Sequence, residues 1–169
     1  LYVGQIEAHK GVVELVHAFL GLNKKIAAEL HIVGGGSELD LIKKITESDL
    51  RITVYGRVER PQLPGIFAQM DVTVVPSLCY ENSPTVIFES FASGVPVLAS
   101  NIEGIAELIR ENENGVTFPA GNGTVLTERL QWCAEHRREL MIMRKSTQNS
   151  VKGLSLVEYI ARLEKIYQE

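Results

Sequence analysis

Short apolar segments alternate along the chain with segments of helical periodicity. The apolar segments predict strands at residues 1–3, 28–33, 52–55, 72–75, 97–99 and 116–118. The spacing of apolar side chains between them predicts helices at 11–22, 37–47, 61–69, 84–93 and 105–109. Three more helices are predicted near 125–136, 139–151 and 156–167. Ser37 is the predicted N-cap of its helix, whereas Pro64 and Gly65 weaken the helix at 61–69.

Strands that alternate with helices predict right-handed crossovers and a parallel sheet. Because the strands are mainly apolar, we expect helices on both faces of this sheet. The pattern therefore predicts the α/β class: a single Rossmann-like, doubly wound domain with a parallel sheet of about six strands. Such sheets bind ligands outside the carboxyl ends of their strands. The loops of interest are thus those that begin at Gly4, Gly34, Gly56, Pro76 and Ser100.

Composition excludes several other classes of protein. The 169 residues suit one domain, and 45% hydrophobic with 22% charged residues argues against disorder. A net charge of -4 argues against a large nucleic-acid surface. No apolar run approaches the roughly 18 residues that span a bilayer, and no signal peptide is visible. Because the chain begins at Leu1 within a predicted core strand, we expect it to be part of a longer protein.

Neither the cysteines nor the histidines have metal-ligand spacing. Cys79 and Cys133 are predicted to be free, buried thiols, which favours a reducing compartment. The histidines are expected to be solvated or structural, although His9 is a minor candidate for a ligand contact because of its loop position.

The segment P-S-L-C-Y-E-N-S-P-T-V-I-F-E leaves the fourth predicted strand and enters a helix. Asn82 or Ser83 can cap that helix, and Pro84 suits its first turn. The backbone N–H groups of Thr85 and Val86 would then point out of the helix, where unpaired donors and the helix dipole favour a phosphate.

Two glutamates flank this predicted anion site: Glu81 on the loop and Glu89 within the helix. Glu89 shares a helix face with Thr85 and Ser93, one turn from the phosphate position and within reach of a ribose. The opposite face, predicted to enter the core, carries Ile87, Phe88, Phe91 and Ala92. The spacing alone is weak evidence, because glutamate is common in this chain, and a solvated surface role is the alternative.

The loop after the first strand offers a second phosphate contact. Gly4 lets a ligand approach the backbone, and Lys10 stands just before a helix. A solvated lysine is the alternative. Neither a P-loop nor the G-x-G-x-x-G fingerprint is present. The glycines at 34–36 are predicted to form a tight turn, with a role in lining a base pocket as the second interpretation.

Taken together, these stretches resemble the C-terminal domain of the retaining group 1 glycosyltransferases of the GT-B fold. The resemblance rests on L-Y-V-G-Q-I-E-A-H-K-G-V at 1–12, L-H-I-V-G-G-G at 30–36, V-Y-G-R-V at 54–58, the 76–89 motif continuing to Ser100, and E-N-G at 113–115. It covers nearly the whole chain in order. It implies that residues 1–169 form the nucleotide-sugar-binding half of a GT-B enzyme whose N-terminal acceptor domain is missing.

The resemblance also implies roles for individual residues. Lys10 and Glu81 match catalytic positions: Lys10 neutralises the leaving diphosphate, and Glu81 contacts the transferred sugar. Glu89 matches the glutamate that binds the donor ribose. The remaining donor-binding positions are Gly4, Gln5, Arg57, Val58, Asn82, Ser83, Thr85 and Val86, with the backbone at 57–58 near the nucleobase. No D-x-D is present, as implied for a fold that holds the diphosphate without a metal, and no cofactor is implied.

Two departures from the family pattern stand out. Gln5 replaces the usual arginine of the diphosphate site, and an amide can hydrogen bond but supplies no charge. The loop after Glu81 reads N-S-P where many members have glycine, so Ser83, Thr85 and Val86 must supply the N–H donors.

The implied reaction is transfer of a sugar, with retention, from a UDP or GDP sugar to an unknown acceptor. The implied partners are the missing domain, the donor and the acceptor, without nucleic acid. A cytoplasmic location is implied, with any contact to the inner membrane face made through the absent half. A non-catalytic nucleotide-binding module is the alternative, and an isomerase of the same architecture has less support. The apolar positions of the last helix, which in the family packs toward the other domain, are expected to be exposed here and to favour self-association.

Overall fold

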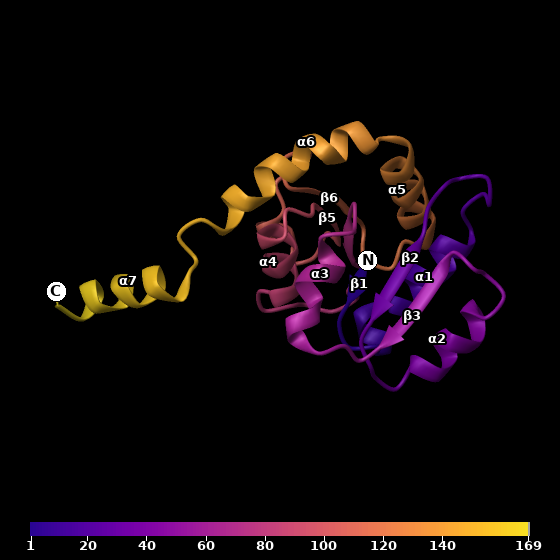
Figure 1. Ribbon diagram of the computed structural model, residues 1–169, viewed down its shortest axis with the longest axis horizontal. Helices are drawn as coiled ribbons and strands as arrows, with labels where there is room; N and C mark the ends of the chain where they lie inside the picture. Colours follow the sequence, from indigo (N-terminus) through magenta and orange to yellow (C-terminus); the bar gives the residue numbers. More distant parts are fainter. Residues whose placement is uncertain (169) are drawn as a thin grey trace.

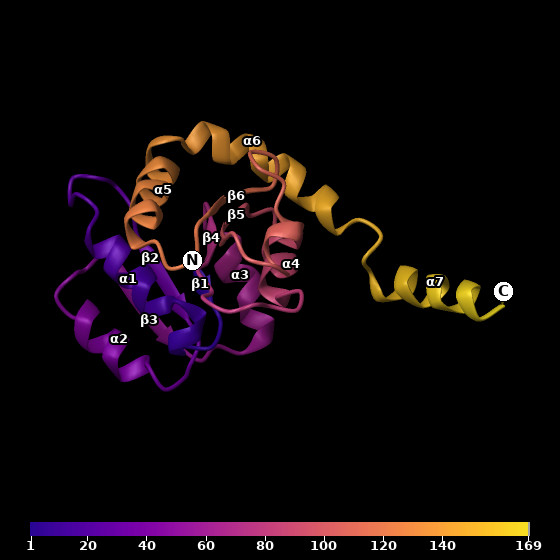
Figure 2. The ribbon, with the colours of Figure 1, turned by 180° about the vertical axis from the view of Figure 1, so that it is seen from behind.

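The computed structural model describes residues 1–168 and contains six parallel strands with helices on both sides (Figures 1 and 2). The strands are β1 (Tyr2–Val3), β2 (Leu30–Val33), β3 (Ile52–Gly56), β4 (Thr73–Val75), β5 (Val97–Ser100) and β6 (Gly115–Phe118). They pair in parallel as β1-β2-β3 and as β4-β5-β6.

Leu1, which directly precedes β1, joins these two groups of three strands. Its nitrogen donates to the carbonyl oxygen of Val72 at 2.9 Å, and its carbonyl oxygen accepts from the nitrogen of Val74 at 2.8 Å. One residue bonded to positions i and i+2 of its neighbour is the pattern of a parallel ladder. The strand order is therefore 3-2-1-4-5-6, and the chain changes direction across the sheet between β1 and β4.

The helices cover both faces of this sheet. They are α1 (Val12–Leu20), α2 (Leu39–Thr46), α3 (Leu63–Phe67), α4 (Thr85–Ala92), α5 (Gly123–Glu135), α6 (Arg137–Thr147) and α7 (Leu156–Gln168). Alternate strand residues point to opposite faces, so Ile32 packs into the core under α1, α2 and α5 while Val33 packs into the core under α3. The predicted α/β, doubly wound fold is confirmed.

Two predicted helices differ in detail from the observed ones. Ser37 does not cap α2, which begins at Leu39; its hydroxyl instead donates to the Glu7 carboxylate at 2.6 Å. The predicted helix at 61–69 is a 3₁₀ turn, Arg60–Gln62, followed by the short α3, because the prolines at 61 and 64 lack the N–H groups of a longer helix.

The start of α4 also differs from the prediction. Pro84 occupies the N-cap position, and neither Asn82 nor Ser83 makes a capping hydrogen bond. Ser83 has a φ of 54°, in the left-handed region, whereas an N-cap residue has extended backbone dihedrals, so Ser83 does not cap the helix.

The buried face of α4 is only partly as predicted. Ile87 and Phe91 are buried, but Phe88 is half-buried and Ala92 is exposed. Ser90 takes the buried position instead, since its hydroxyl finds polar partners: the Val95 carbonyl oxygen at 2.8 Å and the Thr73 hydroxyl at 2.7 Å.

Helix α7 stands away from the domain (Figures 1 and 2), and none of its described residues is buried. Its exposed apolar side chains include Leu156, Tyr159, Ile160 and Ile166, so the predicted exposed strip is confirmed. No helix within residues 1–168 is both long and apolar enough to cross a membrane. Cys133 is buried as predicted, whereas Cys79 lies on the loop before α4 and is partly exposed.

Candidate functional site

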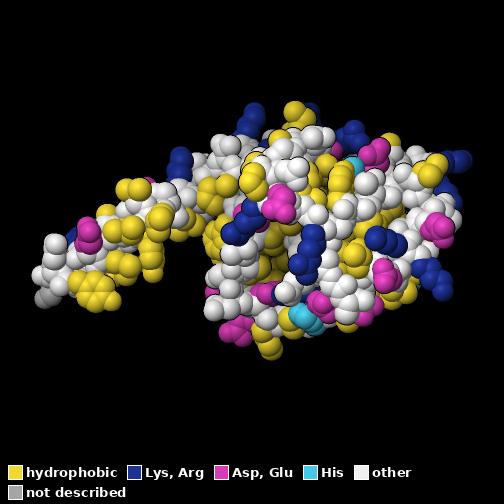
Figure 3. Space-filling view, turned by 60° about the horizontal axis from the view of Figure 1, so that its bottom comes forward, with side chains coloured by type: hydrophobic (Ala, Val, Ile, Leu, Met, Phe, Trp, Pro, Cys, Tyr) yellow, Lys and Arg dark blue, Asp and Glu magenta, His cyan; other side chains and the backbone are white. Residues whose placement is uncertain are grey.

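A cavity of about 320 Å³ opens where β1 and β4 end, at the point where the chain changes direction across the sheet. Figure 3 shows a hollowed face on which basic and acidic side chains border apolar ones. The lining residues are Tyr2 to Gln5, Lys10, Arg60, Leu63, Val74 to Ser77, Glu81, Pro84 to Val86, and Glu89. Two loops and the start of α4 therefore enclose one space.

A larger cavity of about 610 Å³ lies at the opposite edge of the sheet, beside Leu1, Leu30 and Val72. Parallel α/β sheets bind ligands at the carboxyl ends of their strands, and this cavity lies at the amino ends. None of the predicted site residues lines it. The smaller cavity is therefore the candidate site.

The loop after β1 is packed directly against the loop after β4. Gly11 has a φ of 68°, and a Cβ atom there would lie 1.9 Å from the carbonyl oxygen of Pro76. The nitrogen of Leu78 donates to the carbonyl oxygen of His9 at 2.9 Å. This close approach, which needs glycine at position 11, brings Lys10 to Glu81 although they are 71 residues apart.

Lys10 and Glu81 form an ion pair between these two loops. The Lys10 Nζ lies 2.5 Å from Glu81 Oε1, and the Ser77 hydroxyl donates to the same oxygen at 2.8 Å. Both charged side chains are largely buried, with 23% and 13% exposed. The pair is thus shielded from water, where Coulomb attraction is stronger than at an open surface.

A third loop, after β5, packs against the backbone of Glu81. Gly104 has a φ of 81°, and a Cβ atom there would lie 1.5 Å from the Glu81 carbonyl oxygen. Only glycine permits this approach. Sequence reasoning missed Gly104, although it had selected the loop that begins at Ser100.

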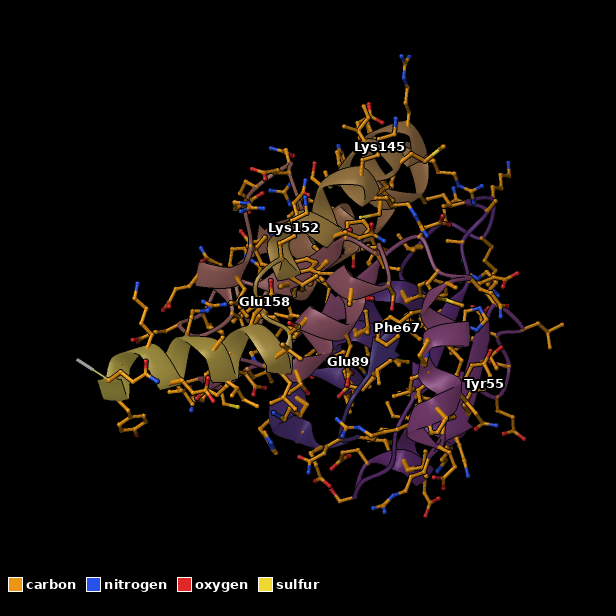
Figure 4. The ribbon with its side chains drawn as sticks, turned by 60° about the vertical axis from the view of Figure 1, so that its left-hand side comes forward. Tyr55, Phe67, Glu89, Lys145, Lys152 and Glu158 are labelled. Carbon is orange, nitrogen blue, oxygen red and sulfur yellow. The ribbon has the colours of Figure 1, made fainter. Side chains whose placement is uncertain are left out.

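The start of α4 faces the cavity with free donors. Within residues 1–168, the N–H groups of Thr85 and Val86 donate to no backbone carbonyl group or side chain. Glu89 lies one helical turn after Thr85. Its side chain points from α4 toward α3, on which Phe67 is labelled (Figure 4). The Arg60 Nη2 lies 3.5 Å from Glu89 Oε1. The cavity thus combines N–H donors, two cations and two carboxylates.

Most of the predicted site residues meet at this cavity, and some do not. Gly4, Gln5, Lys10, Glu81, Thr85, Val86 and Glu89 line it. Asn82 and Ser83 are exposed and lie outside the lining, as do Arg57, Val58 and His9. The Arg57 side chain covers Gly35, where a Cβ atom would lie 2.8 Å from Arg57 Nε. The glycine turn at 34–36 does not line the cavity either.

Tyr2, Ser77 and Arg60 were missed by sequence reasoning. The Tyr2 hydroxyl donates to the Gln5 carbonyl oxygen at 2.5 Å, and burial, with nearby Glu81 and Glu7, raises the pKa of this phenol. Tyr2 therefore stays a neutral donor that fixes the backbone of Gln5. Ser77 lies within the 76–89 motif, and Arg60 lies in the segment that follows Gly56. Their positions just after strand ends could have identified both as site residues.

Comparison with known proteins places these observations in a family. Residues 1–150 match the profile described as glycosyl transferases group 1. An uncharacterized glycosyltransferase, MJ1607 of Methanocaldococcus jannaschii, is 29% identical over 69% of this chain and 30% of its own length. The phosphatidyl-myo-inositol mannosyltransferase of Mycobacterium leprae is 29% identical over 77% of this chain and 35% of its own length.

The fold also agrees with that of a solved structure. The Anabaena protein Alr3699/HepE, solved in complex with UDP, superposes with a TM-score of 0.86 at 19% identity, over 99% of this chain and 47% of that one. The chain spans about a third of the curated relatives and about half of this solved chain. It matches the group 1 profile over most of its length, and so it belongs to the group 1 glycosyl transferases.

Proposed function

We propose that this chain is the donor-binding half of a retaining glycosyltransferase that uses a nucleoside diphosphate sugar, either a UDP or a GDP sugar. The observation that carries the proposal is the convergence of Lys10 and the free N–H groups of α4 on one cavity. The UDP in the Anabaena structure supports a nucleotide ligand for this fold. Transfer of the sugar also requires a second domain, which binds the acceptor.

The chemistry demands stabilisation of negative charge on the leaving diphosphate. When the bond between the anomeric carbon and the diphosphate oxygen breaks, the electron pair stays with that oxygen. Lys10 and the amino end of α4 supply positive potential there. The acceptor hydroxyl oxygen then bonds to the anomeric carbon on the face that the diphosphate leaves, which gives retention, and the hydroxyl proton passes to the departing diphosphate oxygen. In this proposal, stabilising the charge on the diphosphate needs no metal ion.

The two glutamates have different tasks. Glu89 accepts hydrogen bonds from the ribose hydroxyls, one helical turn beyond the phosphate position. Glu81 contacts the transferred sugar through its carboxylate. The hydrogen bond from Ser77 and the ion pair with Lys10 hold that carboxylate in one orientation.

Turnover of the full-length enzyme tests the role of Lys10. Loss of one donor from a preorganised anion site costs about 10²- to 10³-fold in rate, so Lys10→Ala should lower kcat by at least that factor. Lys43→Ala, an exposed lysine of α2, is the matched control and should keep wild-type kcat. Wild-type turnover by Lys10→Ala would remove this residue from the mechanism.

Titration calorimetry of the 169-residue chain with UDP, GDP and ADP tests the donor site directly. We expect weak binding of at least one nucleotide and no transfer, because the acceptor side of the cleft is not part of this chain. Heat from none of the three would contradict the site.

A non-catalytic nucleotide-binding module is the second candidate. Gln5 favours it, because an uncharged amide stands where the family usually has an arginine. The charge of Lys10 is also matched by Glu81 in the structure. Nucleotide binding by the full-length protein without detectable transfer from any nucleotide sugar would support the module.

A further inference from the structure

The charges that line the cavity balance one another. Among the described lining residues, Lys10 and Arg60 are the cations and Glu81 and Glu89 are the anions. Lys10 is held 2.5 Å from Glu81 and is largely buried, so its charge is already matched. A diphosphate carries several negative charges. The donor site proposed above therefore needs a further cation, and Gln5 does not supply one.

Of the two cations that line the cavity, Arg60 is the one whose side chain can move to a bound ligand. It begins the 3₁₀ turn Arg60–Gln62 after β3, and its side chain is 83% exposed. Among the described side chains its only hydrogen bond or ion pair is a single 3.5 Å approach from Nη2 to Glu89 Oε1. An exposed ion pair of this length contributes little to stability. The guanidinium can therefore leave Glu89 at small cost.

Given the proposed function, we propose that Arg60 is the second cation of the donor site and supplies the positive charge that Gln5 does not. The planar guanidinium presents paired N–H donors that match phosphate oxygens, which a single ammonium cannot do. When Arg60 turns to the diphosphate, the Glu89 carboxylate is released to accept from the ribose. One movement of the side chain thus prepares both contacts.

Calorimetric titration of UDP and GDP into the chain and its variants tests this role. Arg60→Gln should weaken binding of the preferred nucleoside diphosphate about tenfold. Arg60→Lys should be intermediate, because lysine keeps the positive charge but lacks the paired N–H donors of the guanidinium. The matched control is Arg138→Gln, an exposed arginine of α6, which should bind like the wild type. Adding Gln5→Arg to Arg60→Gln should restore much of the lost affinity.

The corresponding nucleoside, titrated by NMR at millimolar concentration, separates a phosphate contact from a structural effect. We expect wild type and Arg60→Gln to bind it equally. Equal loss for nucleoside and nucleoside diphosphate would overturn the phosphate role, as would unchanged diphosphate affinity in Arg60→Gln; both leave the proposed donor site intact. If the wild type binds no nucleotide at all, the proposed function fails, and the role of Arg60 fails with it.

Discussion

Replacing Gly104 by alanine tests whether the loop after β5 holds Glu81 in position. The substitution adds one methyl group at a residue with a φ of 81°, and that methyl carbon would lie 1.5 Å from the Glu81 carbonyl oxygen. Ordinary contact between such atoms needs roughly 3.5 Å, so the two loops must separate by about 2 Å. That shift is comparable with the 2.5 Å distance between Lys10 and Glu81, so it is enough to break the ion pair.

Two costs add at Gly104, and the chain contains a control for each. Gly56 has a similar φ of 71° but nothing within 4 Å of its added Cβ, so Gly56→Ala measures the backbone cost alone, about 1 to 2 kcal/mol. Gly123 has neither a positive φ nor a near neighbour, so Gly123→Ala should be neutral or slightly stabilising. Overpacking adds about 1 to 3 kcal/mol, which gives roughly 2 to 5 kcal/mol for Gly104→Ala.

Urea denaturation of the three variants gives the free energies of unfolding, and calorimetry with UDP and GDP gives the affinities. We expect Gly104→Ala to be the least stable and to lose nucleotide affinity, because Glu81 and Lys10 move apart. Gly56→Ala should lose stability and keep affinity. Equal stability losses for Gly104→Ala and Gly56→Ala, with unchanged affinity in both, would refute the supporting role of Gly104.

Three further predictions concern stability and reactivity. The hydrogen bonds from Arg51 lower the pKa of Asp49 to about 2, so the stabilisation lost in Asp49→Asn should be constant above about pH 5 and shrink as the pH falls toward 2, as measured by urea denaturation across that range. Ser90→Ala should lower the free energy of unfolding by about 1 to 3 kcal/mol, because it leaves a buried carbonyl and a buried hydroxyl without a partner. Burial raises the pKa of Cys133 to about 12, so a thiol reagent at pH 8 should label one cysteine, Cys79, in the folded chain and both in denaturant.

Each of these three has a clear contrary result. A stability difference for Asp49→Asn that persists unchanged down to pH 2 would show that the carboxylate is not held by Arg51. An unaltered unfolding midpoint in Ser90→Ala would mean that water satisfies both partners. Rapid labelling of Cys133 in the folded chain would show that α5 opens to solvent.

The strands and the candidate loops could be predicted from the sequence because they depend on local pattern. Strands covered on both faces are mainly apolar, and the loops of a parallel sheet follow directly from where its strands end. Lys10 and Glu89 were selected on this basis, and both line the cavity.

The sequence could not predict details that depend on contacts between distant segments. The ion pair between Lys10 and Glu81 exists because Gly11 fits against Pro76, and a glycine in a sequence does not say which atoms approach it. The predicted cap of α4 was wrong for a related reason: Asn82 and Ser83 have the right chemistry, but the backbone turns at Ser83, where φ is 54°, and Pro84 takes the N-cap position. Arg60 was missed because an exposed arginine resembles any other solvated residue until its partner is known.

The hydrogen bonds of Leu1 with Val72 and Val74 form a seam between the two groups of three strands, and we expect this seam to form after each group has formed. Each group of three strands is built from neighbouring segments, whereas the bonds from Leu1 to Val72 and Val74 close a loop of about 70 residues and so carry a larger entropic cost. Amide hydrogens along this seam should exchange with solvent earlier than those within either group. A ligand that contacts the loops after both β1 and β4 would bridge the seam, and nucleotide should slow that exchange more than any other in the domain.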